Sequence, residues 1–275
     1  MTSTAPHHPV DARSVDGPGA RLDADHAELF EASPDLHGFG GLHGGFELAL
    51  LTTAMQRQTP PGMTLRSATA HLHRPVRSTV RRRTTAVHAG RSLVNHAGSL
   101  DVDDQHPAVT ASAVFAAARR GGPTIDAPTP PAVLPPERCE PFAVPTELLP
   151  LAQHLEIRPT DGNRPFAGGP VPELTAWIRL LGDDRPPDAH RLVVLLDALA
   201  PSYAAVLDVP ALVPTVELTV HPGPGIALAR SPWVLLRARS RFGGLDGWIS
   251  EHLDAWSTDG IHLGSATQLR LLKAG

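Results

Sequence analysis

The sequence has few of the residues that cross-links and metal clusters require. Its 275 residues include a single cysteine, Cys139, which excludes an intramolecular disulfide and every zinc or iron–sulfur site built from several cysteines. The 15 histidines are scattered, without a paired spacing on one helix, so we expect no metal site. We also expect Cys139 to have no chemical role, because it lies in a proline-rich segment without an organised partner.

Long apolar runs and an excess of one charge are also missing. No segment approaches the roughly 18 to 20 apolar residues needed to span a bilayer, and residues 1–16 lack an apolar core of signal-peptide length. The 24 basic and 28 acidic residues give a net charge of −4, which favours neither nucleic acid nor a membrane surface. We therefore expect a cytoplasmic protein with no membrane span and no nucleic-acid partner.

What the sequence does contain is the same order of elements twice. Each half is predicted to have an apolar helix, two strands, a turn and two more strands. The helices are expected over 46–55 and after Asp188, which is a suitable N-cap. In the first half, the strands are expected over 64–72, 80–89, 92–102 and 108–118. In the second half, the corresponding strands are expected over 212–221, 233–240, 247–254 and 261–272. Two further strands of the second half are expected over 154–158 and 174–180. This order indicates an internal repeat.

The two copies are separated by a change in composition. Nine prolines lie between Gly121 and Pro150, and proline cannot donate to the hydrogen-bond ladder of a sheet. We predict a flexible arm over residues 1–20, a first repeat over 21–120, a proline-rich linker over 121–150 and a second repeat over 151–275.

The second repeat contains one carboxyl group within an otherwise apolar helical segment. Residues 191–201 read Arg-Leu-Val-Val-Leu-Leu-Asp-Ala-Leu-Ala-Pro, so Asp197 stands alone inside an apolar helical segment. A buried, unpaired carboxylate is unfavourable, so we expect Asp197 to be protonated, hydrogen-bonded or placed against a polar cavity. The alternative is a carboxylate turned to the edge of the helix.

Two polar strand residues are candidates to meet Asp197. Alternation along the strand 212–221 puts Thr215 on one face with Glu217, Thr219 and His221, and Gln268 shares a face of the last strand with Gly264, Ala266 and Arg270. A helix carboxylate, a hydroxyl and an amide converge if the sheet wraps the helix. Each of these strand residues taken alone is equally typical of an ordinary strand.

The first helix begins in a glycine-rich segment. Five glycines lie within His37–Gly45, so Gly44 and Gly45 are placed at a helix N-terminus, where free backbone N–H groups polarise a carbonyl oxygen or hold an anion. An ordinary glycine-rich turn into a helix is the alternative. Further on, Arg81, Arg82 and Arg83 concentrate positive charge, either for the phosphates of a ligand or as the charged edge of a sheet.

The order and spacing of several motifs resemble the double-hotdog acyl-CoA thioesterases, the type II thioesterase family and its actinobacterial relatives. The motifs are Gly44-Gly45, His73-Arg74-Pro75, Gly90-Arg91-Ser92, Trp177-Ile-Arg179, Leu196-Asp197-Ala198, Pro214-Thr215-Val216-Glu217, and Asp259-Gly260 leading to Gln268. The resemblance implies an α+β double hotdog, in which each half wraps an antiparallel sheet around a long apolar helix and the two sheets join side by side.

The resemblance also implies a reaction and a site. A triad of Asp197, Thr215 and Gln268 would bind and activate water for attack on an acyl-CoA or acyl-carrier thioester. An N–H of Gly44 or Gly45 would bind the carbonyl oxygen, and His43 beside them would take part in binding the substrate. Arg81 and Arg83 would meet the phosphates of coenzyme A. No cofactor is implied beyond the coenzyme A of the substrate, and a homodimer or larger homo-oligomer is expected by analogy.

The two halves differ at the positions that matter for this reaction. Aligning them places Thr52, Ser67 and Val114 opposite the three triad residues, so we expect a degenerate site in the first repeat. The alternatives to a hydrolase are a non-hydrolytic acyl-binding or scaffold protein, and a dehydratase or cyclase acting on a carrier-bound intermediate. A dehydratase needs a histidine and a carboxylate together, and the second helix offers only His190 near its start.

Overall fold

The computed structural model describes residues 28–104, 106–119, 121 and 125–273, so the arm predicted over residues 1–20 lies outside it. The first half contains β1 (Glu28–Phe30), α1 (Gly44–Arg57), β2 (Met63–Leu72), β3 (Val80–Ala89), β4 (Leu93–Asp101) and β5 (Val109–Ala117). The second half contains β6 (Leu155–Pro159), β7 (Glu173–Leu180), α2 (Ala189–Leu196), β8 (Thr215–Pro222), β9 (Val234–Gly243), β10 (Trp248–Ser257) and β11 (His262–Leu271). Every strand predicted from the sequence is present.

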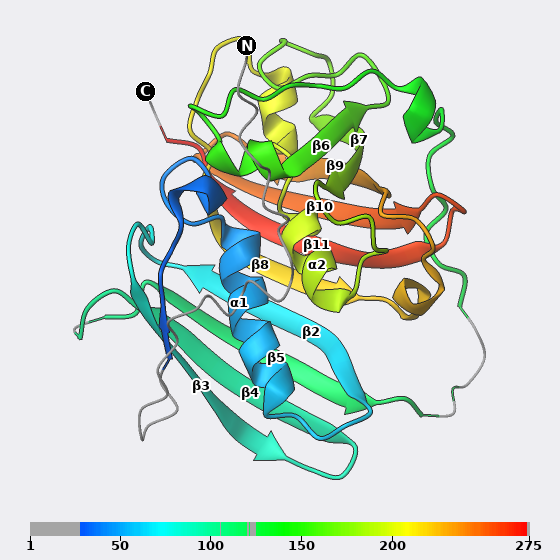
Figure 1. Ribbon diagram of the computed structural model, residues 1–275. Coiled ribbons are helices and arrows are strands. Elements are labelled where there is room, and N and C mark those ends of the chain that lie inside the picture. The colour runs from blue at the N-terminus through cyan, green and yellow to red at the C-terminus, as the bar shows by residue number, and fades with distance from the viewer. Residues whose placement is uncertain (1–27, 105, 120, 122–124, 274–275) are drawn as a thin grey trace, which may run out of the picture.

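All of these strands belong to one antiparallel sheet with the order β1-β3-β4-β5-β2-β8-β11-β10-β9-β7-β6. The order β3-β4-β5-β2 of the first half is mirrored by β8-β11-β10-β9 in the second. The halves meet where β2 pairs with β8, from Ala68 opposite Val220 to His71 opposite Glu217. The structure is therefore an α+β double hotdog with the two sheets joined side by side, as predicted (Figure 1).

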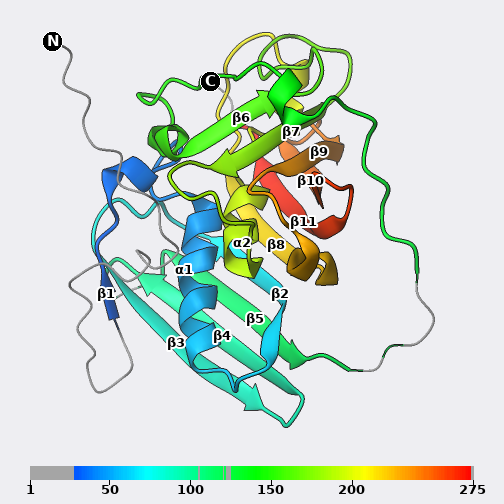
Figure 2. The same cartoon turned by 45° about the vertical axis from the view of Figure 1, so that its right-hand side comes forward.

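The two helices lie on the same face of this sheet and contact each other (Figure 2). The largest buried apolar cluster fills the layer between helices and sheet, and its fully buried members include Leu48, Leu51, Leu192 and Leu195. Helix α1 has 14 residues and is buried along most of its length. The helix contact brings the beginning of α1 next to the end of α2, where the candidate site lies.

Helix α2 differs from the prediction in its length and in its end. Asp188 caps its start as predicted, because its carboxylate accepts hydrogen bonds from the backbone N–H groups of His190 and Arg191. However, α2 has only 8 residues, and Asp197 is its C-cap and not an interior residue. The proline at position 201 has no N–H to donate to the carbonyl oxygen of Asp197 four residues earlier, and its ring would clash there in a helix. Asp197 therefore lies where the helix ends and the chain turns away.

The proline-rich connector covers the outer face of the second half of the sheet. The indole N–H of Trp177 donates to the backbone carbonyl of Leu134 at 2.8 Å, and that of Trp256 donates to the carbonyl of Pro128 at 2.7 Å. Cys139 is buried in the same cluster, and burial raises the pKa of its thiol. The connector thus supplies backbone acceptors to tryptophans on the face opposite the helices.

Candidate active site

Asp197 lies where the start of α1, the end of α2 and strand β11 meet. Its Oδ2 atom accepts a hydrogen bond from the backbone N–H of Gly45 at 2.7 Å. Its Oδ1 atom accepts one from Nε2 of Gln268 at 3.0 Å. Asp197 is 8% exposed and Gln268 2%, so a buried carboxylate is satisfied by one helix N-terminus and one amide. Each carboxylate oxygen still has a lone pair available for a further donor.

The glycine pair at the start of α1 makes this approach possible. A Cβ atom on Gly45 would lie 2.8 Å from Cβ of Asp197 and 3.0 Å from the carbonyl oxygen of Val193. One on Gly44 would lie 3.1 Å from Oδ2 of Asp197. Glycine is therefore needed because the end of α2 comes too close for a side chain, and the positive end of the α1 dipole faces the carboxylate.

Thr215 joins the same group through Gln268. Its hydroxyl donates to Oε1 of Gln268 at 3.4 Å, which leaves the amide NH₂ of Gln268 directed at Asp197. Thr215 is half-buried, and Gln268 lies deeper. The structure thus brings together Asp197, Thr215 and Gln268, the three residues predicted from the sequence.

The face on which Thr215 lies differs from the prediction. Alternation placed Thr215 with Glu217, but the Glu217 side chain is 41% exposed and contacts His71. The pairing of β8 with β11 shifts between these residues, since Glu217 lies opposite Leu269 whereas Thr215 lies opposite Arg270. This bulge skips Val216 and turns Thr215 to the face that carries Gln268.

His43 contacts Asp197 from the N-cap of α1. Its Nε2 atom is 3.0 Å from the backbone carbonyl oxygen of Asp197 and 3.4 Å from Oδ2. A carbonyl only accepts, so Nε2 carries the hydrogen in this contact, and in a neutral ring Nδ1 is then an acceptor. Nδ1 is buried and has no hydrogen-bond partner among the described residues. The Nε2–H of His43 therefore orients Asp197 and is already used in this contact.

Sequence reasoning missed a buried ion pair next to the triad. Arg270 donates from Nε to Oε2 of Glu251 at 2.6 Å, and its Nη2 lies 3.8 Å from Oδ1 of Asp197. Oε1 of Glu251 accepts from the backbone N–H of Ser202 at 2.5 Å. The sequence contained a signal for Arg270, which shares a strand face with Gln268, but the charge partner on β10 was visible only in the fold.

Glu47 is a second buried carboxyl group near Asp197 that the prediction passed over. It lies on α1, one turn from the helix start, and is 3% exposed. Burial and then the negative charge of Asp197 raise the pKa of Glu47 well above its usual range. The sequence signal was the same as for Asp197, a lone carboxyl group within an apolar helix.

The arginines proposed for coenzyme A phosphates lie elsewhere. Arg81 pairs with Asp104 at 2.8 Å and Arg83 pairs with Asp101 at 2.9 Å. Both alternate along β3 with the buried Arg82, so their side chains lie on the sheet face opposite the helices. The structure does not bring them to Asp197.

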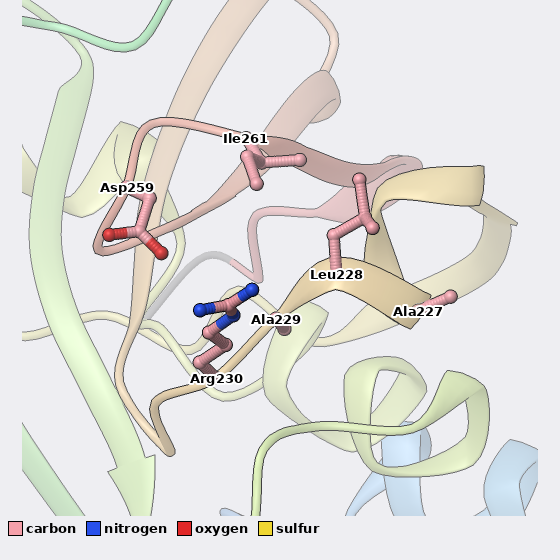
Figure 3. Close-up of a pocket in the computed structure, with 6 residues that line it drawn as sticks. All are labelled: Ala227, Leu228, Ala229, Arg230, Asp259 and Ile261. Atoms are coloured by element: carbon pink, nitrogen blue, oxygen red, sulfur yellow. The ribbon is translucent and has the colours of Figure 1, made fainter.

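A pocket with a volume of about 330 Å³ lies apart from the triad. It is formed by the 3₁₀ helix η6 (Pro224–Leu228), the residues after it and the turn that follows β10, with Arg230, Asp259 and Ile261 directed toward one another (Figure 3). Asp197, Thr215 and Gln268 are not among the residues that line it. The pocket is therefore separate from the candidate site.

With two hotdog halves joined in one sheet and a polar site between their helices, the structure belongs to the class of double-hotdog proteins. Comparison with known protein families matches residues 32–116 to the acyl-CoA thioesterase N-terminal domain and residues 136–272 to the acyl-CoA thioesterase C-terminal domain. The chain belongs to this acyl-CoA thioesterase family, and thioester hydrolysis is the general chemistry of its class. A comparison with curated proteins gave no match.

Solved structures share the fold across nearly the whole chain. A hotdog-fold protein of unknown function from Alicyclobacillus acidocaldarius is 23% identical, with a TM-score of 0.85, and the match covers 97% of this chain and 100% of that one. A putative thioesterase II from Thermobifida fusca is 21% identical, with a TM-score of 0.77 and coverage of 94% and 99%. An acyl-CoA thioesterase II from Mycobacterium marinum is 16% identical, with a TM-score of 0.72 and coverage of 93% and 95%.

Within the part of the chain that the structure describes, no helix has both the length and the apolar character needed to cross a membrane.

Proposed function

We propose that this chain hydrolyses acyl-CoA thioesters with a water molecule activated by Asp197, Thr215 and Gln268. The observation that carries the proposal is the convergence of a buried carboxylate, an amide and a hydroxyl at one end of α1. A thioester carbonyl is electrophilic enough for direct attack by an oriented water, so no serine or cysteine nucleophile is required.

Each triad residue has a distinct task in this mechanism. Asp197 accepts the proton of the attacking water on an oxygen lone pair that no protein donor uses. Gln268 holds Asp197 in place through its amide, and Thr215 fixes the orientation of that amide. The thiol of coenzyme A leaves when the tetrahedral intermediate collapses, and the proton held by Asp197 returns to the products.

Of the candidate donors to the substrate carbonyl oxygen, two already donate hydrogen bonds within the protein. The N–H of Gly45 is used by Asp197, and the Nε2 hydrogen of His43 by the carbonyl of Asp197. The N–H of Gly44, in the first turn of α1, has no intrahelical acceptor. We therefore assign the oxyanion contact to Gly44, at the positive end of the helix dipole.

The decisive experiment is a thiol-release assay with acyl-CoA substrates on the parent protein and on Asp197→Asn. Asparagine keeps the shape but cannot take a proton, so we expect kcat to fall by about a hundredfold or more. Glu217→Gln is the matched control, because this carboxylate lies on β8 near Thr215 but on the outer face, and its kcat should stay unchanged.

Two results would contradict the proposal. Unchanged turnover in a folded Asp197→Asn protein would remove Asp197 from the mechanism. Binding of acyl-CoA without thiol release by the parent protein would instead favour the non-hydrolytic acyl-binding function.

A further inference from the structure

The side chain of Glu47 on α1 is buried and has no polar partner among the described residues. Leu50 and Leu51, which lie one turn further along α1, are fully buried. The described residues form no hydrogen bond or ion pair with the Glu47 side chain. Buried polar groups are nearly always paired, and an unpaired one in a folded protein calls for an explanation.

The helix geometry directs Glu47 toward the candidate site. Glu47 lies three residues after Gly44, so both lie on one side of α1. That side faces the end of β2 and the carboxylate of Asp197, because a Cβ atom on Gly44 would lie 2.7 Å from Leu72 and 3.1 Å from Oδ2 of Asp197. Helix side chains lean toward the helix N-terminus, which carries the Glu47 carboxyl group back toward these residues.

The two neighbouring carboxyl groups have opposite surroundings. Asp197 receives hydrogen bonds from Gly45 and Gln268 and has Arg270 nearby, whereas Glu47 has no donor. Burial and the negative charge of Asp197 raise the pKa of Glu47 well above its usual range, which favours the neutral carboxyl group. The neutral form offers both an O–H donor and a carbonyl acceptor.

We propose that Glu47 recognises an oxygen substituent on the acyl group, so that the preferred substrates are hydroxyacyl or oxoacyl thioesters. This inference rests on the proposed thioesterase function. Coenzyme A is large and highly charged and remains at the surface, so a side chain that is 3% exposed meets the acyl part of a substrate. A hydrocarbon chain would leave the carboxyl group unpaired, whereas a hydroxyl or oxo group would pair with it.

The test is a thiol-release assay with pairs of acyl-CoAs of equal chain length, from butanoyl to octanoyl, in which one member carries a hydroxyl or oxo group on the second, third or fourth carbon. For the parent protein we expect kcat/KM to be about tenfold or more higher for the oxygenated member of at least one pair. Glu47→Met, which keeps an unbranched side chain without the carboxyl group, should abolish or reverse this preference. Glu47→Gln keeps a donor and an acceptor and should retain it.

The parent protein alone decides the inference even if Glu47→Met does not fold. If the parent protein hydrolyses the unsubstituted member of every pair at least as well as the oxygenated member, the proposed role of Glu47 is wrong. A preference for the oxygenated member that persists in a folded Glu47→Met protein also contradicts it. In both cases the proposed function stands if hydrolysis is lost in Asp197→Asn. Absence of hydrolysis for every acyl-CoA contradicts the proposed function itself.

Discussion

At the scale of single residues, two carboxyl groups with the same sequence signature have different physical states. Asp197 and Glu47 each interrupt an apolar helical segment. Asp197 has hydrogen-bond donors on both oxygens, whereas Glu47 is buried without a donor and lies near the negative charge of Asp197. The difference in partners is the reason that we propose Asp197, and not Glu47, as the base.

The unpaired state of Glu47 predicts a gain in stability when the carboxyl group is removed. We expect Glu47→Met to raise the free energy of unfolding at neutral pH by about 1–3 kcal/mol, because a buried polar group without a partner is replaced by an apolar one. The pKa of Glu47 is raised in the folded state, so its neutral form stabilises the fold at low pH and this contribution is lost as pH rises.

Urea unfolding at about pH 5 and about pH 8 checks both parts of this prediction. The difference between Glu47→Met and the parent protein should be larger at the higher pH. Glu147→Met is the control, since Glu147 is exposed in the connector, and it should change the stability little at either pH. A folded Glu47→Met protein that is less stable than the parent would show that the carboxyl group has a stabilising partner.

At the scale of elements, the site depends on two departures from regular structure. Helix α2 ends early, so Asp197 turns toward the N-terminus of α1, and a bulge in β8 turns Thr215 to the same face as Gln268. Strand β2 has a corresponding register shift between Leu65 and Ser67. Matching the two bulges places Leu65, and not Ser67 as aligned from the sequence, at the position of Thr215. The repeat therefore includes the bulge, although the first half carries no Asp-Thr-Gln triad.

The close contact of α1 with the end of α2 predicts the effect of a single added methyl group. Gly45→Ala would place Cβ 2.8 Å from Asp197 and 3.0 Å from the carbonyl oxygen of Val193. We expect a loss of stability of about 1–3 kcal/mol and a lower kcat, because Asp197 must move away from the Gly45 N–H. Gly40→Ala is the matched control, since nothing lies within 4 Å of its added Cβ.

Urea unfolding and thiol release measured on the same samples separate the two effects. A Gly45→Ala protein with the stability and kcat of the parent would show that the two helices are farther apart than the structure has them.

At the scale of the whole molecule, the continuous sheet has a helix layer on one face and, in its second half, the connector on the other. The outer face carries a buried carboxylate, Asp254, which contacts His262 at 3.0 Å and His252 at 3.4 Å. His262 also packs edge-on against Trp256, whose indole is held by the connector. The charge cluster therefore lies next to the point where the connector is attached.

Asp254 predicts how the fold responds to acid. Burial would raise the pKa of Asp254, but hydrogen bonds and charge interactions with His252 and His262 lower it below its ordinary value of 3.8. A lowered pKa contributes stability above 3.8 that is lost as pH falls toward the folded-state pKa. We expect Asp254→Asn to reduce the free energy of unfolding by about 1 kcal/mol at about pH 5, with a smaller difference at about pH 3.

Urea titrations at these two pH values measure the effect, with Asp246→Asn as a control at an exposed turn. A difference that grows as pH falls would mean that Asp254 gains no stabilisation from its histidine partners.

The sequence by itself determined the strands, the repeat, the fold class and the identity of the three candidate triad residues. The strands and the repeat follow from the local periodicity of apolar residues, and Asp197 stands out as one carboxyl group in an apolar segment. The fold class and the two partners of Asp197 follow from the resemblance of several motifs to the acyl-CoA thioesterase family. Only the tertiary structure decided which face Thr215 occupies, which N–H Asp197 uses, and that Glu47 is left without a partner. The reason is physical: a bulge shifts side-chain alternation by one residue, and hydrogen bonds such as Gly45 to Asp197 join positions 152 residues apart, whose approach is fixed by helix packing.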